Sequence, residues 1–182
     1  RENELLSFPV KTIRHNPIIE IVLVEPEIPQ NTGNIIRLCA NIGARLHLVK
    51  PLGFRLEDPG LRRAALDYGD LTDVVIHESS KRFFDPAKVE RVFIATSHSD
   101  ILYTNPKYQQ GDTIIFGRES QGLPLEITAG VNPSNRLSIP MNEGNRSLNL
   151  SNAVAIIAYE MWRQLDFQKE PANFPHSEKS IQ

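Results

Sequence analysis

The 182-residue chain has 40% hydrophobic and 23% charged positions, a balance that indicates one folded domain with a core and excludes a disordered or fibrous chain. Its 22 acidic and 20 basic residues give a formal net charge of −2, which excludes a global positive field, so any RNA must bind a local basic patch. The single cysteine, Cys39, excludes an internal disulfide, and the five separated histidines lack metal-ligand spacing.

The start of the chain carries no recognisable targeting signal. Residues 1–17 contain Glu2 and Glu4 and no continuous apolar stretch, unlike a signal peptide. The longest apolar run, Ile18–Val24, is interrupted by Glu20 and is far shorter than the about 20 residues that span a bilayer. We therefore expect a cytoplasmic protein without a metal, in which residues 1–17 are an N-terminal extension.

Short β-branched runs alternate with helix-compatible stretches along the chain. Six strands are expected, at Ile18–Val24, Leu46–Val49, Asp73–Ile76, Arg91–Thr96, Thr113–Phe116 and Arg136–Ile139. Helices are expected between them at 31–42, 57–67, 79–84 and 120–129. The alternation predicts an α/β fold with a mostly parallel six-stranded sheet and helices on both faces. We expect this domain to cover residues 18–168, followed by a flexible tail at 169–182.

The first helix has clear end signals. Asn31 or Thr32 can cap its start, and Gly43 can close its end. From Ile35 onward, apolar residues recur at the i, i+3, i+4, i+7 spacing of one helix face, which includes Cys39. We therefore predict a core thiol at Cys39 and not a nucleophile.

The last helix, expected from about 149 to 165, is apolar around more than one face. Leu150 begins a buried-type stripe, and Ile156, Tyr159 and Trp162 extend the apolar surface well around the cylinder. Such a helix needs two packing partners. A subunit interface would supply the second one.

Three polar, glycine-containing loops carry the functional signal of the sequence. They cover residues 26–44, 116–124 and 139–153, and each precedes or follows a predicted strand. In open α/β sheets, ligands bind outside the carboxyl ends of the strands, and all three loops can lie on that edge. We therefore predict that they form one site.

Better-known phosphate and nucleophile motifs do not fit these loops. Gly117 and Gly122 have the spacing of a P-loop, but Leu123 and Pro124 stand where Lys and Ser/Thr are required. A nucleophile elbow around Ser120 would place Arg118 at a glycine position. No G-x-G-x-x-G occurs, which disfavours an ordinary dinucleotide fold.

The three loops together resemble a known family. The segments N-T-G-N-I-I-R-L-C-A-N (31–41), F-G-R-E-S-Q-G-L-P (116–124) and I-P-M…N-R-S-L-N-L-S-N-A-V (139–154) are similar to the three motifs of the SPOUT-class, SpoU-type 2′-O-ribose methyltransferases. The segments 24–34, 61–68 and 159–165 resemble most closely the branch that methylates the wobble cytidine or uridine of tRNA. The similarity runs in order from Ile18 to about Leu165.

This resemblance implies a fold, a cofactor and partners. The fold would be the SPOUT fold, with a deep trefoil knot in the C-terminal part, which is a rare departure from unknotted topology. S-adenosylmethionine would bind bent within the knotted loops, at positions matching Ala95, Gly117, Ile139 and Ser147. The substrate would be the anticodon stem-loop of tRNA, and a homodimer would form through the C-terminal helix.

The resemblance also implies catalytic residues. Arg37 matches the family's catalytic arginine, where a guanidinium can clamp a phosphate and stabilise charge on the 2′-oxygen. Asn31, Glu119 and Asn149 match polar positions of the three motifs. Simpler interpretations stay open: Arg37 as a surface ion-pair residue, Asn31 and Asn149 as helix caps, and Glu119 as a partner of a helix dipole.

The expected basic patch for RNA is made of arginines. These are Arg55, Arg62, Arg63, Arg118 and Arg146, although Arg62 and Arg63 are also compatible with a solvated helix face. His98 is a departure, because similar proteins usually have lysine and glycine in that loop.

Two alternatives to wobble methylation stay open. The same chemistry can act on another tRNA or rRNA site, because residues that touch only ribose and phosphate carry no sequence information. A knotted RNA-binding protein without catalysis is the alternative from a different class.

Overall fold

The computed structural model describes residues 17–68, 73–84, 89–145 and 147–169. It contains the six expected strands: β1 (Glu20–Val24), β2 (Arg45–Val49), β3 (Asp73–His77), β4 (Val92–Ala95), β5 (Thr113–Phe116) and β6 (Arg136–Leu137). The α-helices are α1 (Pro29–Ile42), α2 (Pro59–Tyr68), α3 (Leu125–Gly130) and α4 (Leu150–Gln164). Most of the expected extension at 1–17 and of the expected tail at 169–182 lies outside the described residues.

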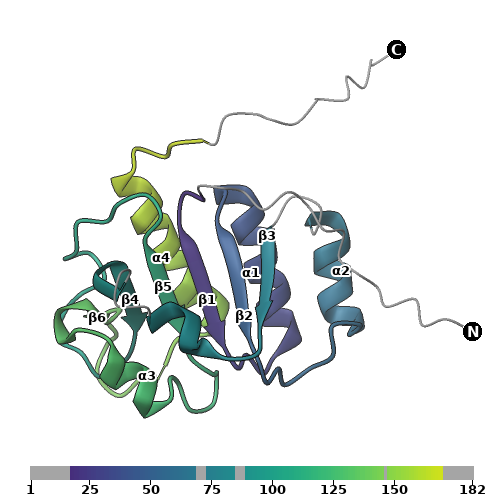
Figure 1. The fold of residues 1–182 in the computed structure, drawn as a ribbon, viewed down its shortest axis with the longest axis horizontal. Helices are drawn as coiled ribbons and strands as arrows, with labels where there is room; N and C mark the ends of the chain where they lie inside the picture. Colours follow the sequence, from purple (N-terminus) through teal and green to yellow (C-terminus); the bar gives the residue numbers. More distant parts are fainter. Residues whose placement is uncertain (1–16, 69–72, 85–88, 146, 170–182) are drawn as a thin grey trace, which may run out of the picture.

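The strands form one sheet in the order β3-β2-β1-β5-β4-β6, with every described pair parallel (Figure 1). The chain moves outward from β1 through β2 to β3, whereas β5, β4 and β6 lie on the other side of β1. The strand order therefore reverses between β1 and β5. The carboxyl ends at such a reversal diverge and leave a crevice for a ligand.

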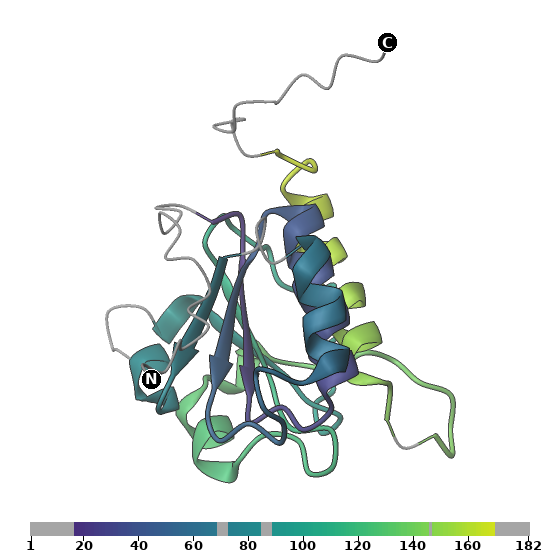
Figure 2. The same cartoon turned by 90° about the vertical axis from the view of Figure 1, so that its right-hand side faces the viewer.

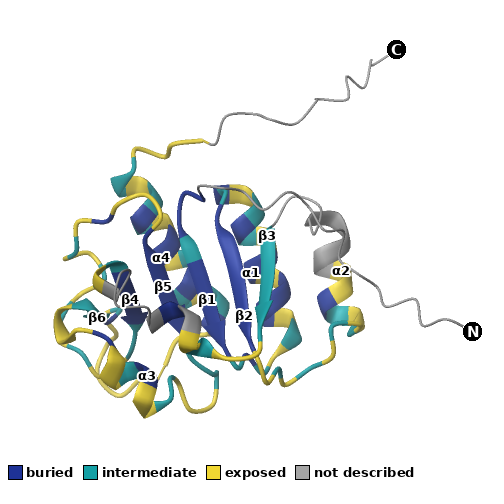
Figure 3. Ribbon diagram, in the orientation of Figure 1, coloured by how far each residue is buried: buried dark blue, intermediate teal, exposed yellow. Residues whose placement is uncertain are grey.

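One face of the sheet is covered by α1, α2 and α4, which stand together in the side view (Figure 2). Buried side chains of β1 and β5, such as Ile21 and Ile114, form the larger core with Ile35 of α1 and Val154 of α4. The central strands are almost completely buried (Figure 3). This continuous burial is expected of a parallel sheet covered on both faces.

The opposite face has thinner cover. A 3-10 helix at Ser80–Phe84 and the short α3 pack on a second core, in which Phe83 and Ile127 contact the other face of the same strands. The prediction of helices on both faces is confirmed, but within the described ranges one face carries the longer helices α1, α2 and α4 and the other carries short ones. Within the described residues, no helix has the length and apolarity needed to cross a membrane.

Helix α1 begins earlier than predicted. It starts at Pro29 after Ile28, which makes no side-chain capping bond, so the prediction of Asn31 or Thr32 as the N-cap is wrong. The reason is that proline is favoured in the first helical turn, where its missing N–H costs nothing. The predicted end is confirmed, because Gly43 closes α1 in the left-handed conformation with φ 73°.

Two other predicted helices differ in the structure. The stretch predicted as a helix at 120–129 is helical only from Leu125, because residues 118–122 fold back on themselves as a turn. The helix predicted at 79–84 is a 3-10 helix. The knot is compatible with the strand order but stays a prediction.

A buried ion cluster joins the starts of three strands. The Arg45 guanidinium of β2 bonds Asp73 of β3 at 2.8 Å and Glu20 of β1 at 3.2 Å. The side chains of Arg45 and Asp73 are only 8% and 10% exposed. An exposed pair, Lys50 and Glu78, lies at the other end of the same strands with side chains 44% and 84% exposed.

These two pairs give a stability test. We expect Asp73→Asn to lower the free energy of unfolding by about 3 kcal/mol, because it leaves a buried guanidinium without its nearest countercharge. Glu78→Gln should change it by no more than about 0.5 kcal/mol, because its pair is solvated. Urea unfolding of the two variants and the unchanged protein measures both effects. Equal costs would contradict the role given to burial.

Candidate functional site

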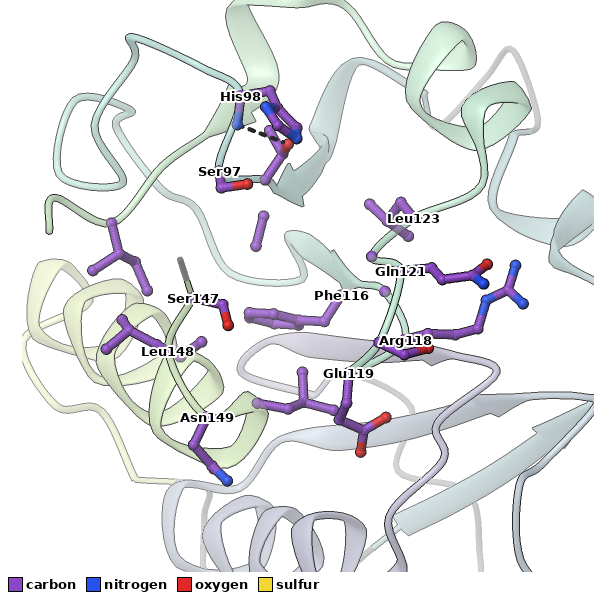
Figure 4. A pocket seen from close by; sticks show the side chains of 18 of the residues that line it. Ser97, His98, Phe116, Arg118, Glu119, Gln121, Leu123, Ser147, Leu148 and Asn149 are labelled. Atoms are coloured by element: carbon purple, nitrogen blue, oxygen red, sulfur yellow. Dashed lines mark hydrogen bonds between the residues drawn. The ribbon is translucent and has the colours of Figure 1, made fainter. Parts of the chain in front are cut away.

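A pocket of about 980 Å³ opens at the carboxyl edge of the sheet, where the strand order reverses (Figure 4). Its walls come from the segments that follow β4, β5 and β6 and from the first turn of α4. Phe116, at the end of β5, lies in the middle of the view, with Ser97 and His98 on one side and Asn149 on the other. The predicted meeting of distant loops at one sheet edge is therefore confirmed.

Most of the predicted site residues line this pocket. The four positions expected to contact the cofactor are all present, namely Ala95, Gly117, Ile139 and Ser147. Three of the four expected catalytic residues also line it, namely Asn31, Glu119 and Asn149. Hydrogen bonds join Asn31 to Glu119 and to Asn149, which lie 88 and 118 residues away in the chain.

Glu119 connects the loop after β5 to the start of α1. Its carboxylate accepts hydrogen bonds from the backbone N–H of Glu27 at 2.8 Å and of Ile28 at 3.1 Å. It also accepts one from the Asn31 side-chain amide at 3.2 Å. A negative charge at a helix N-terminus is favourable, so Glu119 supplies from another loop the capping that Ile28 cannot provide.

Asn31 links Glu119 to the start of the last helix, α4. Its side chain is buried, and its Oδ1 accepts a hydrogen bond from the Asn149 Nδ2 at 3.0 Å. The Asn149 Oδ1 in turn accepts from the backbone N–H of Ser151, at 2.9 Å, and of Asn152, and so caps α4. The capping interpretation is confirmed for Asn149. Glu119, Asn31 and Asn149 thus form one chain of hydrogen bonds across all three loops.

Gly117 is required by a tight turn. A Cβ at this position would lie 2.1 Å from the carbonyl carbon of Gly122, which is far inside van der Waals contact. Arg118 and Gly122 exchange backbone hydrogen bonds of 3.1 and 2.9 Å across the turn. The glycine is therefore required because the loop closely approaches itself at this position.

Arg37 is the one predicted catalytic residue that is not among the described residues lining the pocket. It is exposed on α1, six residues after Asn31, and it is absent from the described residues that line the pocket. Six residues correspond to about 9 Å along a helix axis. A role at the site therefore requires a neighbouring subunit or a substrate that extends along α1.

The predicted basic residues are divided among three places. Arg55, Arg62 and Arg63 are exposed on and before α2, outside the described pocket lining. Arg118 lines the pocket, but its guanidinium pairs with Glu25 at 3.3 Å. Arg146 lies outside the described residues.

The sequence did not reveal the role of Glu27. Its carboxylate accepts hydrogen bonds from the backbone N–H of Ser120 at 2.9 Å and from the Ser120 hydroxyl at 2.8 Å. These bonds hold the pKa of Glu27 below its ordinary value, so the group is ionised at neutral pH. The available signal was an acidic residue three positions after the end of β1, at the ligand edge of the sheet.

Cys39 takes no part in the site. Its side chain is completely buried in the core under α1, and burial raises the pKa of the thiol. A thiol that stays protonated is a poor nucleophile, so the prediction of a core cysteine is confirmed.

Comparison with known proteins assigns this arrangement to a family. Residues 18–159 match the SpoU rRNA Methylase family. A tRNA (cytidine(34)-2′-O)-methyltransferase of Methylovorus glucosotrophus (strain SIP3-4) is 49% identical over 150 residues, which cover 82% of this chain and 97% of that protein.

Solved structures agree with this assignment. One that is described as giving structural insights into the 2-OH methylation of C/U34 on tRNA has a TM-score of 0.76 and 42% sequence identity, covering 84% of this chain and 99% of the other. An AdoMet-bound rRNA methyltransferase from Sinorhizobium meliloti shares the fold, with a TM-score of 0.72 at 21% identity, covering 82% of this chain and 57% of the other.

The turn at Gly117 gives a test of the pocket wall. We expect Gly117→Ala to destabilise the protein by about 3 kcal/mol or more, because the new methyl group meets backbone that cannot move independently. The control is Gly144→Ala, where φ is +85° but no atom lies within 4 Å of the added carbon. Gly144→Ala should lower the free energy of unfolding by only about 1–2 kcal/mol, the cost of placing a residue with a side chain in the left-handed conformation. Chemical denaturation distinguishes them, and an equal or smaller cost at Gly117 would show that the turn adapts.

Proposed function

This chain belongs to the SpoU rRNA methylase family, and we propose that it transfers a methyl group from S-adenosylmethionine to the ribose 2′-hydroxyl of the wobble nucleotide, cytidine or modified uridine, in tRNA. The observation that carries the proposal is the chain of hydrogen bonds from Glu119 through Asn31 to Asn149, which unites the three motif loops around one pocket. The proposal places the enzyme in the cytosol, where tRNA is modified.

The pocket suits a cofactor of this size. Ligand pockets in proteins usually have volumes of about 300–1,000 Å³, so a volume of about 980 Å³ leaves room for the cofactor and for a target nucleoside beside it. Ala95, Gly117, Ile139 and Ser147 line it from four different segments and would hold the cofactor. When bound, S-adenosylmethionine supplies an electrophilic methyl group and leaves as S-adenosylhomocysteine.

The protein's contribution is mainly to position the hydroxyl and to stabilise its developing charge. Asn31, Glu119 and Asn149 already satisfy one another's hydrogen bonds, so they form a rigid floor on which the ribose can be oriented. A guanidinium then stabilises the negative charge that develops on the ribose 2′-oxygen. With a pKa above about 12, arginine is suited to electrostatic help and not to removing the proton.

We assign this guanidinium to Arg37 of a second subunit. Arg37 lies outside the described lining of its own pocket. Helix α4, which packs beside α1, leaves Ile156 and Tyr159 36% and 43% exposed on its outer face. Burying this face in a homodimer would bring α1 of one subunit to the pocket of the other, as an isologous interface does for both sites at once.

The tRNA would contact the exposed arginines near α2. Arg55, Arg62 and Arg63 are exposed there, and they supply the local positive charge that a chain of net charge −2 needs for RNA. Arg118 is less suited to a phosphate contact, because its charge is already balanced by Glu25.

A variant of Arg37 tests the assigned chemistry. We expect Arg37→Ala to keep its affinity for S-adenosylmethionine but to lower kcat by about 100- to 1,000-fold, the usual cost of losing one transition-state charge stabiliser. Incubation with labelled S-adenosylmethionine and tRNA from a strain lacking the activity, followed by nucleoside analysis, measures the product. Arg37→Lys is the matched control and should retain part of the rate. Equal losses of cofactor affinity and kcat would show that the role is misassigned.

Mixing subunits tests whether Arg37 acts across the dimer. Arg37→Ala homodimers should have the low kcat given above, and Gly117→Ala homodimers should lose activity because the added methyl group displaces the pocket loop. Random mixing should restore about one quarter of the normal activity, because half of the dimers are mixed and each of these has one intact site made from two subunits. If each pocket used its own Arg37, every mixed site would keep one defect and no activity would return.

A further inference from the structure

Contacts cross in both directions between the loop after β1 and the loop after β5. The carboxylate of Glu119 accepts from the backbone N–H groups of Glu27 and Ile28, and the carboxylate of Glu27 accepts from the N–H and hydroxyl of Ser120. Beside them, Glu25 pairs with Arg118 at 3.3 Å. We call this set of residues, Glu25, Glu27, Arg118, Glu119 and Ser120, the clasp.

The clasp is reciprocal at the level of single residues. The backbone N–H of Glu27 donates to the carboxylate of Glu119, and the carboxylate of Glu27 accepts from the N–H of the next residue of that loop, Ser120. Hydrogen bonds to an ionised carboxylate are stronger than neutral ones, so each loop stabilises the backbone of the other. The lowered pKa of Glu27 agrees with this arrangement, because Ser120 favours the charged form.

The backbone around Glu27 is held from several sides. Glu25 is in the left-handed region, with φ 51°, an unfavourable conformation for a residue with a side chain. Gly53 packs so closely that a Cβ on it would lie 2.7 Å from the Glu27 Cα, and the Gly53 N–H donates to the Pro26 carbonyl at 2.9 Å. The Glu27 carboxylate is therefore directed by a fixed backbone, unlike that of an ordinary exposed glutamate.

Both halves of the clasp belong to the pocket wall. Ile28 and Asn31 line the pocket from the side of α1, and Gly117 and Ser120 line it from the loop after β5. Glu27 itself is not among the described lining residues. Its carboxylate can therefore act on a ligand only through the shape of the loop at 117–122.

We infer that Glu27 is a positioning residue for the methyl transfer: by holding Ser120, it keeps the loop at 117–122 in the shape that receives the cofactor before the cofactor arrives. The identity of the cofactor rests on the proposed function, whereas the control of the loop rests only on the contacts above. Because Glu27 is not among the described residues that line the pocket, we expect it to set cofactor affinity and to leave the chemical step unchanged.

Population arithmetic gives the size of the effect. A ligand that binds only one loop conformation has its apparent Kd raised by the reciprocal of the fraction of molecules in that conformation. Loss of a charge-assisted pair of hydrogen bonds should reduce that fraction about tenfold. We expect Glu27→Ala to raise the Kd and the KM for S-adenosylmethionine about tenfold, with kcat at saturating cofactor within about twofold of normal. Glu27→Gln keeps the shape of the side chain without its charge, so its Kd and KM for S-adenosylmethionine should lie between those of the unchanged protein and those of Glu27→Ala.

The experiment combines calorimetric binding of S-adenosylmethionine, the KM and kcat of tRNA methylation, and hydrogen exchange of the cofactor-free protein. Faster exchange at 117–122 in Glu27→Ala is expected, and Glu126→Gln, which removes an exposed carboxylate of α3 outside the clasp, is the control for charge. Ser120→Ala removes one of the two bonds while leaving Glu27 intact. If the clasp is one unit, the double variant should be less impaired than the product of the two single effects.

The outcomes separate this inference from the proposed function. Unchanged exchange and unchanged cofactor affinity in Glu27→Ala would overturn the inference, and so would a fall in kcat with an unchanged KM. If Glu27→Ala does not fold, the same comparisons on Ser120→Ala decide. A normal protein that binds no S-adenosylmethionine would instead overturn the proposed function, while faster exchange in the variant would still support control of the loop by Glu27.

Discussion

The site depends on one carboxylate. Glu119 follows β5, yet it accepts the first free N–H groups before α1 and the amide of Asn31. The start of α1 lacks a side-chain cap of its own, and the charge of Glu119 meets the positive end of that helix. Together with the bonds between Glu27 and Ser120, this contact holds the loop after β5 against the start of α1, and through Asn31 it reaches the Asn149 cap of α4.

The topology of the sheet explains why these loops meet. Parallel strands direct all their carboxyl ends to one edge, and the reversal of order between β1 and β5 separates the following segments to opposite faces. The clasp joins the loops after β1 and β5 at this edge, and the pocket lies between the loop after β5 and the segments after β4 and β6. Positions far apart in the chain thereby become neighbours, which explains how a site can be rigid although loops build most of it.

The division of roles follows from the same geometry. Residues at the pocket are largely neutral or paired, as with Arg118 and Glu25, whereas the exposed arginines lie near α2. A pocket of this kind suits a cofactor and a ribose, and the surface charge suits phosphates. Contacts with ribose and phosphate do not distinguish one base from another. Under the proposed function, selection of the wobble position would come from the shape of the tRNA and its fit to two subunits.

The sequence by itself determined the class of fold, the number of strands, the core position of Cys39 and the set of loops that form the pocket, because these follow from local periodicity and from segments that resemble a family. The start of α1, the length of α3, the reason for Gly117 and the exclusion of Arg37 from its own pocket were decided only by tertiary structure. For the start of α1, the length of α3 and Gly117, the cause is a contact with a distant or folded-back segment: a proline-started helix capped by Glu119, and a turn closed between Arg118 and Gly122. Local sequence patterns do not encode such contacts, since the partners become neighbours only when parallel strands bring their ends to one edge.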